Sequence, residues 1–232
     1  MIEQKNYMDK FPAPMTKGER IRRMIWCAVR AVTVKWLPPV LCFGWVRMMY
    51  RLFGAKVHPT AKIYPSADVF MPWNLEIGEW STIGGNVHIL NAAPLIIGRD
   101  CNVSERAYIC CASHNIQSDV HEQVHKPVVL KDRSWVAAEA FVGMGVILGE
   151  GAVVGARAAV FKDVEPWKVV GGNPAKVLKN REISRNMNCI NHELGGASLK
   201  IKVASCRPFS IFAAPESPLI FCRFYGERRV AA

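Results

Sequence analysis

The chain has 232 residues, of which half are hydrophobic and 21% are charged. This length is sufficient for one large domain with a buried core, and the composition excludes wholesale disorder. Lysine and arginine outnumber aspartate and glutamate by 30 to 19, and the excess lies at the two ends. Residues 1–54 carry ten basic and three acidic side chains, residues 176–232 ten and four, and residues 55–175 ten and twelve. A nucleic-acid-binding protein would place this charge on the folded body, so we expect no nucleic-acid partner.

Targeting signals and cysteine spacing indicate the cellular compartment of the protein. The longest apolar run, residues 36–46, contains two prolines and falls well short of the roughly twenty residues that a membrane-spanning helix needs. The N-terminal residues lack the apolar stretch of a signal peptide. The eight cysteines include no CxxC pair, which argues against structural zinc and favours free thiols. We therefore expect a cytoplasmic protein without a metal.

The first segment, residues 1–54, is predicted to be basic, helical and amphipathic. Helical spacing over residues 20–37 puts five apolar residues on one face: Ile21, Ile25, Ala28, Val32 and Trp36. Basic residues lie off that face: Arg22, Arg23, Arg30 and Lys35. Two roles stay open, since the segment could cover the exposed edge of the fold that follows or rest on anionic lipid as a peripheral membrane contact.

A six-residue repeat organises residues 55–165. An aliphatic residue recurs at every sixth position, with dipeptide interruptions at 75–76 and 95–96 and a longer one at 115–129. The fifteen positions are Val57, Ile63, Val69, Ile77, Ile83, Ile89, Ile97, Val103, Ile109, Leu130, Val136, Val142, Leu148, Val154 and Val160. The residue four places after each of them is small or a valine, with Trp73 as the one large exception.

Period six fits neither an α-helix nor an ordinary hairpin sheet. It is typical of a chain that turns a corner every six residues, with the aliphatic side chain inside and a small residue at the tight corner. We therefore predict an all-β fold, a parallel β-helix of about five triangular coils, in preference to a sandwich of short strands. The coils are residues 57–74, 77–94, 97–114, 130–147 and 148–165. Glycines at 78, 84, 98, 143, 149 and 155 are expected where a corner needs positive φ.

This pattern resembles the hexapeptide-repeat acyltransferases, and within them the exopolysaccharide O-acetyltransferases of the colanic-acid type. The likeness spans about residues 20–181 and is carried by residues 53–78, 86–98, 107–115 and 135–181, the last of which contains GGNPAK. The resemblance implies a left-handed β-helix, acetyl-CoA as co-substrate, and a sugar hydroxyl of an exopolysaccharide or lipid-linked glycan precursor as acceptor. It also implies a homotrimer with its sites between subunits.

His114 is the predicted catalytic base. It ends the third coil, where the chain leaves for the polar loop 115–129, and long loops inside compact folds are usually functional. An imidazole is largely neutral at pH 7, as a general base requires. In the enzymes that the chain resembles, a histidine before an extended loop takes the proton of the acceptor hydroxyl. We expect direct attack on the thioester in a ternary complex, with the oxyanion held by a backbone N–H of the Ala138 region.

Acetyl-CoA carries phosphates and amides, so its site needs cations and an exposed coil edge. Ala138 and Ala156 are one coil apart, and we expect them to stack and, by resemblance, to offer backbone groups to the pantetheine arm. The resemblance also places Trp135 beside that arm.

The segment 166–182 is predicted to contact CoA. Just before this segment, Phe161 and Lys162 match a Thr-Lys pair that lies at CoA in the family. Phe161 therefore lacks the hydroxyl of that threonine. Lys176 and Lys179 match basic positions near the adenosine phosphates, although a solvated lysine surface is the open alternative. Residues 183–232 have no counterpart and stay unassigned.

Asn86 and Asn91 are candidates for binding the acceptor or orienting the imidazole, or else for satisfying backbone groups at a corner. Cys110 is interpreted as filling the core, and no Ser-His triad is predicted at Ser113.

Three other hypotheses compete with acetyl transfer. Residues 121–125 spell HEQVH, the HExxH string of zinc proteases, but that motif requires a helix. A γ-carbonic-anhydrase-like zinc site could use His88, His114, His121 and His125. A non-catalytic β-helix used for assembly would dispense with His114 altogether.

Overall fold

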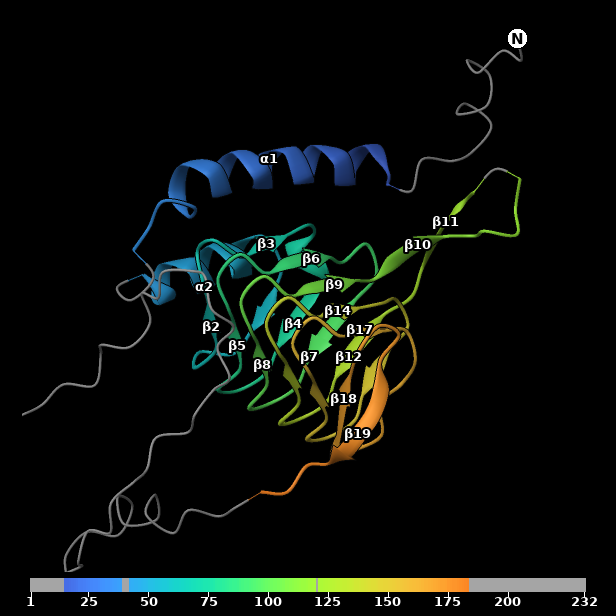
Figure 1. The fold of residues 1–232 in the computed structure, drawn as a ribbon. Helices are drawn as coiled ribbons and strands as arrows, with labels where there is room; N and C mark the ends of the chain where they lie inside the picture. The colour runs from blue at the N-terminus through green and yellow to red at the C-terminus, as the bar shows by residue number, and fades with distance from the viewer. Residues whose placement is uncertain (1–14, 39–41, 120, 184–232) are drawn as a thin grey trace, which may run out of the picture. The chain divides into compact units, whose positions relative to one another are not determined.

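The computed structural model describes residues 15–38, 42–119 and 121–183 (Figure 1). Two helices come first, α1 (Lys17–Thr33) and α2 (Phe43–Leu52), and a single turn of 3-10 helix, η3, covers Pro72–Asn74. The strands are short and follow in this order: β1 (Lys56–Val57), β2 (Lys62–Ile63), β3 (Asp68–Val69), β4 (Leu75–Ile77), β5 (Thr82–Ile83), β6 (His88–Leu90), β7 (Leu95–Ile97), β8 (Asn102–Val103), β9 (Tyr108–Cys110), β10 (Ala112–His114), β11 (Gln123–His125), β12 (Val128–Leu130), β13 (Trp135–Val136), β14 (Phe141–Val142), β15 (Ile147–Leu148), β16 (Val153–Val154), β17 (Ala159–Val160), β18 (Lys168–Gly171) and β19 (Lys176–Asn180).

The strands form three sheets that are the sides of a triangular solenoid. Sheet A has the order β1-β4-β7-β12-β15, sheet C has the order β3-β6-β9-β14-β17, and sheet B runs β2-β5-β8-β13-β16-β18-β19. All pairs in these sheets are parallel except β18 with β19. Each coil gives one strand to each sheet, so the predicted parallel β-helix is confirmed.

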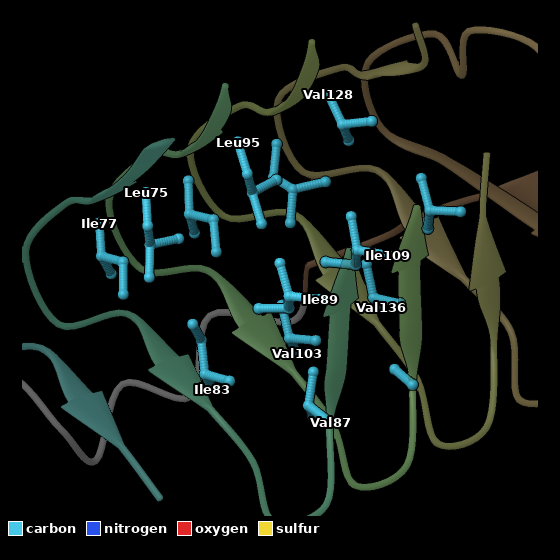
Figure 2. Close-up of a cluster of buried hydrophobic side chains, with 14 of the residues drawn as sticks. Leu75, Ile77, Ile83, Val87, Ile89, Leu95, Val103, Ile109, Val128 and Val136 are labelled. Carbon is cyan, nitrogen blue, oxygen red and sulfur yellow. The ribbon is translucent and has the colours of Figure 1, made fainter. Parts of the chain in front are cut away.

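The inward residues explain why this sequence makes this solenoid. All fifteen aliphatic positions of the six-residue repeat are buried, with at most 6% of any side chain exposed. Figure 2 shows such side chains from successive coils stacked along the inside, among them Ile83, Val103 and Val136. Each corner brings the next aliphatic residue inward, so one continuous apolar column holds the coils together.

The predicted reason for the corner glycines is wrong. Glycines 78, 84, 98, 143, 149 and 155 are not among the residues with positive φ; the corner residues two places later are, Trp80 and Asn86 among them. The glycines are needed because stacked backbones approach closely. A Cβ on Gly78 would lie 2.7 Å from the carbonyl carbon of Gly98, and one on Gly149 would lie 2.4 Å from the nitrogen of Pro166.

The two helices cover the first edge of the solenoid, one of the two roles left open above, but not with the face expected. Coil-one carbonyls accept hydrogen bonds from the helices: Trp26 Nε1 donates to Val69 and Arg51 to Val57. Arg47 and Arg30 donate likewise to the carbonyls of residues 61 and 67. The predicted apolar face points away instead, and its residues Ile21, Ile25, Ala28, Val32 and Trp36 are all exposed.

The predicted loop 115–129 contains strand β11 and the start of β12. β10 and β11 pair antiparallel in a hairpin that projects from the solenoid (Figure 1). At the other end, β18 continues sheet B and β19 folds back on it. All of the tail 183–232 except Ile183 lies outside the described residues.

Candidate active site

His114 is the last residue of β10, and its side chain is exposed on the hairpin. Its Nδ1 lies 2.6 Å from the carbonyl oxygen of His121, across the hairpin. A carbonyl oxygen only accepts hydrogen bonds, so Nδ1 carries a proton, and in the neutral ring Nε2 has the lone pair. His114 is therefore held in the tautomer that a general base acting through Nε2 requires.

A second pair of contacts fixes the segment that carries the His121 carbonyl. The backbone N–H of Asn115 donates to the carbonyl of Glu122 over 2.9 Å, and the Asn115 side-chain amide donates to the Glu122 carboxylate over 2.7 Å. Hydrogen bonds from the side chains of Ser118 and Asn115 lower the pKa of Glu122 below its ordinary value. Glu122 is thus ionised at neutral pH and ties the two ends of the turn together.

Ala138 and Ala156 occupy equivalent corners between sheets B and C. Ala138 lies between β13 and β14 and Ala156 between β16 and β17. The N–H of Arg157 donates to the carbonyl of Ala138 over 3.0 Å, so the two corners are stacked as expected. Within the described part of the chain, neither Ala138 nor Ala156 uses its own N–H in a backbone hydrogen bond. These two donors are free for a ligand.

Trp135 and Lys179 lie in one lateral row across sheet B. The register runs from Trp135 to Val153, from Val153 to Val169, and from Val169 to Lys179. Residues in register on neighbouring strands project from the same face, and three strand spacings amount to about 14 Å. Trp135 is 41% exposed, and its Nε1 donates to the hydroxyl of Ser104.

A pocket of ≈ 540 Å³ beyond the fifth coil gathers three of the predicted cofactor residues, Phe161, Lys162 and Lys176. It also contains Lys168, which the sequence analysis missed. Lys168 Nζ donates to the side-chain oxygen of Asn180 over 2.8 Å. The only signal in the sequence was its place just before the VVGG segment.

The predicted base and the two predicted cofactor alanines lie at different corners of one chain. His114 follows β9 of sheet C and precedes β12 of sheet A, so it belongs to the corner between sheets C and A. Ala138 and Ala156 belong to the corner between sheets B and C, and His114 is not among the residues that line the pocket beside Phe161. A single subunit does not bring His114 to the corner that holds Ala138 and Ala156.

Known proteins share this sequence and this fold. The chain is 35% identical over 170 residues to the "Putative colanic acid biosynthesis acetyltransferase WcaF" of Escherichia coli K12, a match that covers 73% of this chain and 93% of that protein. The chain belongs to the hexapeptide-repeat acetyltransferases. No protein-family model matches it.

Other relatives of this acetyltransferase agree. An O-acetyltransferase of E. coli K12 named for lipopolysaccharide biosynthesis, WbbJ, is 28% identical over 123 residues, which are 48% of this chain and 60% of that protein. Two solved structures share the fold. A hexapeptide-repeat acetyltransferase of Vibrio cholerae, in complex with acetyl-CoA, has a TM-score of 0.65 at 24% identity and covers 76% of this chain and 99% of its own. A galactoside acetyltransferase with coenzyme A has a TM-score of 0.66 at 19% identity and covers 73% and 86%.

The two asparagines differ in what they can offer an acceptor. Asn91 is fully buried, and its side-chain amide exchanges hydrogen bonds with the backbone N–H and C=O of Met71 at 2.9 and 2.7 Å. Asn91 thus satisfies the hydrogen-bonding groups of the backbone, which was the alternative to acceptor binding. It presents no polar atom at the surface. Asn86 is exposed, with φ of 55°, at the corner between sheets B and C.

The acetyltransferase has charged groups on that same corner that sequence reasoning missed. The Glu139 carboxylate contacts Arg106 and accepts from Arg157 Nε over 2.6 Å. The Arg157 guanidinium is the largest influence that lowers the pKa of Glu139. Arg106, Glu139 and Arg157 occupy the positive-φ position of three successive coils, and Asn86 occupies the same position one coil earlier. That spacing was the signal available in the sequence.

Neither thiol chemistry nor a metal centre emerges from the described residues. Burial raises the pKa of Cys111 to about 12, which disfavours a thiolate nucleophile. Residues 121–125 enter strand β11 rather than a helix, so His121 and His125 do not share a helical face. Among residues 15–38, 42–119 and 121–183, no group of three or more His, Cys, Asp or Glu side chains is placed to hold a metal ion.

Proposed function

We propose that this enzyme transfers the acetyl group of acetyl-CoA to a sugar hydroxyl of an exopolysaccharide or lipid-linked glycan precursor, with His114 as the general base. The proposal is carried by one observation, the 2.6 Å contact from Nδ1 of His114 to the carbonyl of His121, which leaves Nε2 free to accept a proton. The printed names of the E. coli relatives, which refer to colanic acid and lipopolysaccharide biosynthesis, support the acceptor class.

The chemistry is a direct transfer within a ternary complex. Nε2 of His114 takes the hydroxyl proton while the hydroxyl oxygen attacks the thioester carbonyl carbon. The N–H of Ala138 or Ala156 donates to the oxygen that becomes negative. The tetrahedral intermediate then breaks its C–S bond, and the protonated imidazole returns the proton to the CoA thiolate. No acetyl-enzyme is required, in line with the burial of Cys111.

The site is proposed to lie between subunits of a homotrimer. Within one chain His114 and the Ala138 corner lie at different edges of the solenoid, while the hairpin carries His114 outward (Figure 1). A neighbour's hairpin would bring its imidazole to the corner that holds the pantetheine arm. This arrangement makes assembly a condition of activity.

The cofactor phosphates are assigned to the basic end of the solenoid. Lys162 and Lys176 share a pocket with Lys168 and the exposed ring of Phe161, and Lys179 is exposed on the same strand as Lys176, β19. Lysines bind phosphate as point charges, so high salt would weaken this contact. Trp135 extends the proposed CoA-binding surface along sheet B, where it would lie beside the pantetheine arm.

The compartment belongs to the same proposal. The five described cysteines are free thiols, as expected in a reducing cytoplasm. No helix among the described residues is long and apolar enough to cross a membrane. We place the enzyme at the cytoplasmic face of a membrane, in peripheral contact through residues 1–54.

The proposal is tested by measuring CoA thiol release from acetyl-CoA against a panel of nucleotide sugars and lipid-linked glycans. We expect at least one acceptor to raise release well above hydrolysis, and the His114→Ala variant to abolish that increase. Release that no acceptor stimulates, or stimulation that survives in the variant, would overturn the assignment. A trimer without acceptor-dependent release would favour the assembly role instead.

A further inference from the structure

Helix α1 faces the solenoid with its cationic side. Arg30 forms an ion pair with Asp68 at 2.9 Å, Arg23 stacks over Phe70 at 3.9 Å, and Arg22 donates to the carbonyl of residue 53. Trp26 is the buried residue of the helix. The first coil exposes backbone carbonyls at its edge, and side-chain N–H donors satisfy them better than apolar groups would. This requirement explains why the arginines turn inward.

The opposite side of α1 is apolar and faces solvent. Ile21, Met24, Ile25 and Val32 are between 51% and 79% exposed. At 1.5 Å per residue the stripe from Ile21 to Val32 is about 16 Å long. A helix on a globular protein ordinarily buries its apolar stripe and exposes its charges, so α1 has the reverse orientation.

Helix α2 shares part of this arrangement, although it also buries Val46, Met49 and Tyr50. Arg47 and Arg51 donate to carbonyls of the first coil, while Trp45, Met48 and Leu52 are 43%, 48% and 73% exposed. The indole of Trp45 donates to the carbonyl of Thr33, which joins the start of α2 to the end of α1. The exposed apolar surface is therefore not confined to α1.

Basic side chains flank the stripe at both ends. Lys17 and Arg20 are exposed in the first turn, and Lys35 is exposed just after the last one. Lys35 Nζ lies 5.5 Å above the ring of Trp36, which is 78% exposed. An apolar stripe with lysine, arginine and tryptophan at its margins is the composition of a helix that lies in the interface of an anionic bilayer.

We infer that the outward stripe of α1, formed by Ile21, Met24, Ile25 and Val32, docks on the surface of an anionic phospholipid bilayer. The contact deepens the proposed function, and its purpose rests on that function: a bilayer-bound enzyme meets a lipid-linked acceptor at the membrane surface. A second copy of the chain is a poorer occupant. Two stripes packed together would bring their basic ends into proximity, and like charges repel.

The test is co-sedimentation of the full chain with vesicles of phosphatidylcholine, with or without phosphatidylglycerol, in the absence of acetyl-CoA. We expect binding to the anionic vesicles that weakens with salt, and a loss of about tenfold or more in the variant Ile25→Ser/Val32→Ser. The matched control is Trp80→Ser, which removes a 65% exposed tryptophan from a corner of the solenoid and should bind as the parent does.

Circular dichroism and thermal melting establish that the variants are folded. Equal binding by the stripe variant, or no binding of the parent to anionic vesicles, would overturn the inference. A change in oligomer mass by light scattering in the stripe variant would point to self-association instead. Because the assay contains no acetyl-CoA, its failure leaves the proposed acetyl transfer intact.

Discussion

The imidazole of His114 is bound through Nδ1 to the main-chain carbonyl of His121, 2.6 Å away across the β10–β11 hairpin. The bond fixes the tautomer and limits rotation of the ring, and both effects come from the fold of the hairpin rather than from another side chain. The orientation of the imidazole therefore depends on the pairing of Asn115 with Glu122, which joins the two sides of the hairpin.

Replacing His114 by alanine should lower turnover by about 10²- to 10⁴-fold, because the acceptor hydroxyl loses its proton acceptor. Binding of acetyl-CoA should persist, since its proposed contacts lie elsewhere. Steady-state kinetics and calorimetry measure the two effects. The control is His121→Asn, which keeps the carbonyl that His114 uses and tolerates the φ of 48° at that position. Near-parental turnover in His114→Ala would rule out this base.

Replacing Glu122 by alanine should loosen the turn that presents the His121 carbonyl. We expect turnover to fall about tenfold while KM for acetyl-CoA is unchanged, as for a residue that positions the base without touching the substrate. Glu122→Gln keeps an acceptor for the Asn115 amide and should recover much of the loss. If both variants shift KM for acetyl-CoA equally and leave kcat alone, Glu122 does not act through His114.

The same carboxylate makes the hairpin sensitive to acid. The pKa of Glu122 is lower in the folded chain than its ordinary value. The ionised carboxylate therefore stabilises the hairpin fully at pH values above the ordinary carboxyl range. This stabilisation is lost as the pH falls through the lowered pKa. The protection factors for amide exchange at residues 114–119 and 121–123 should therefore fall below about pH 4, and the Glu122→Gln variant should not show this fall. Acid sensitivity of equal size in both proteins would contradict the assignment.

Covering the first coil should contribute measurably to stability. Trp26 is 1% exposed, and its indole N–H donates to the carbonyl of Val69 over 3.0 Å. Trp26→Phe removes that donor and leaves the carbonyl buried and unpaired, which should cost about 1–3 kcal/mol in urea unfolding. Trp36→Phe changes a 78% exposed tryptophan and should shift stability by less than about 0.5 kcal/mol. Equal effects would mean that the α1 cover is loosely held.

Close backbone approach predicts opposite outcomes for two glycines. A Cβ at Gly78 would meet backbone atoms of Gly98 at 2.7 Å, whereas one at Gly18 has nothing within 4 Å. Gly78→Ala should destabilise the solenoid by about 1–3 kcal/mol, and Gly18→Ala in α1 should be neutral or stabilising by up to about 1 kcal/mol. Thermal melting measures both, and a harmless Gly78→Ala would contradict the stated role of the glycine.

The solenoid could be predicted from the sequence because period six is a local signal. The spacing alone predicts that each aliphatic residue of the six-residue repeat, from Val57 to Val160, is buried, and no distant partner has to be known. The role of the repeat glycines was predicted wrongly, since the contact of Gly78 with Gly98 depends on stacking between coils.

The helix face could not be predicted in the same way. Apolar periodicity in α1 identifies a stripe, but the side that docks was decided by the carbonyls of the first coil, which favour Arg30 and Trp26 as donors. The candidate site shows the same limit. The sequence indicated His114 by its place before a loop, but the carbonyl of His121 that orients it is set by a hairpin pairing that no pattern of side chains records.

The central claim, a site shared between subunits, is tested most directly by mixed trimers of His114→Ala with Ala156→Trp. Each parent should be inactive, the first for want of a base and the second because the indole blocks the proposed cofactor corner. Native mass spectrometry verifies that mixed trimers have formed. In each mixed trimer, one of the three sites pairs an intact Ala156 corner with the intact hairpin of a neighbour. Mixed trimers should therefore recover up to about a third of full activity. Verified mixed trimers that stay as inactive as their parents would contradict the shared site.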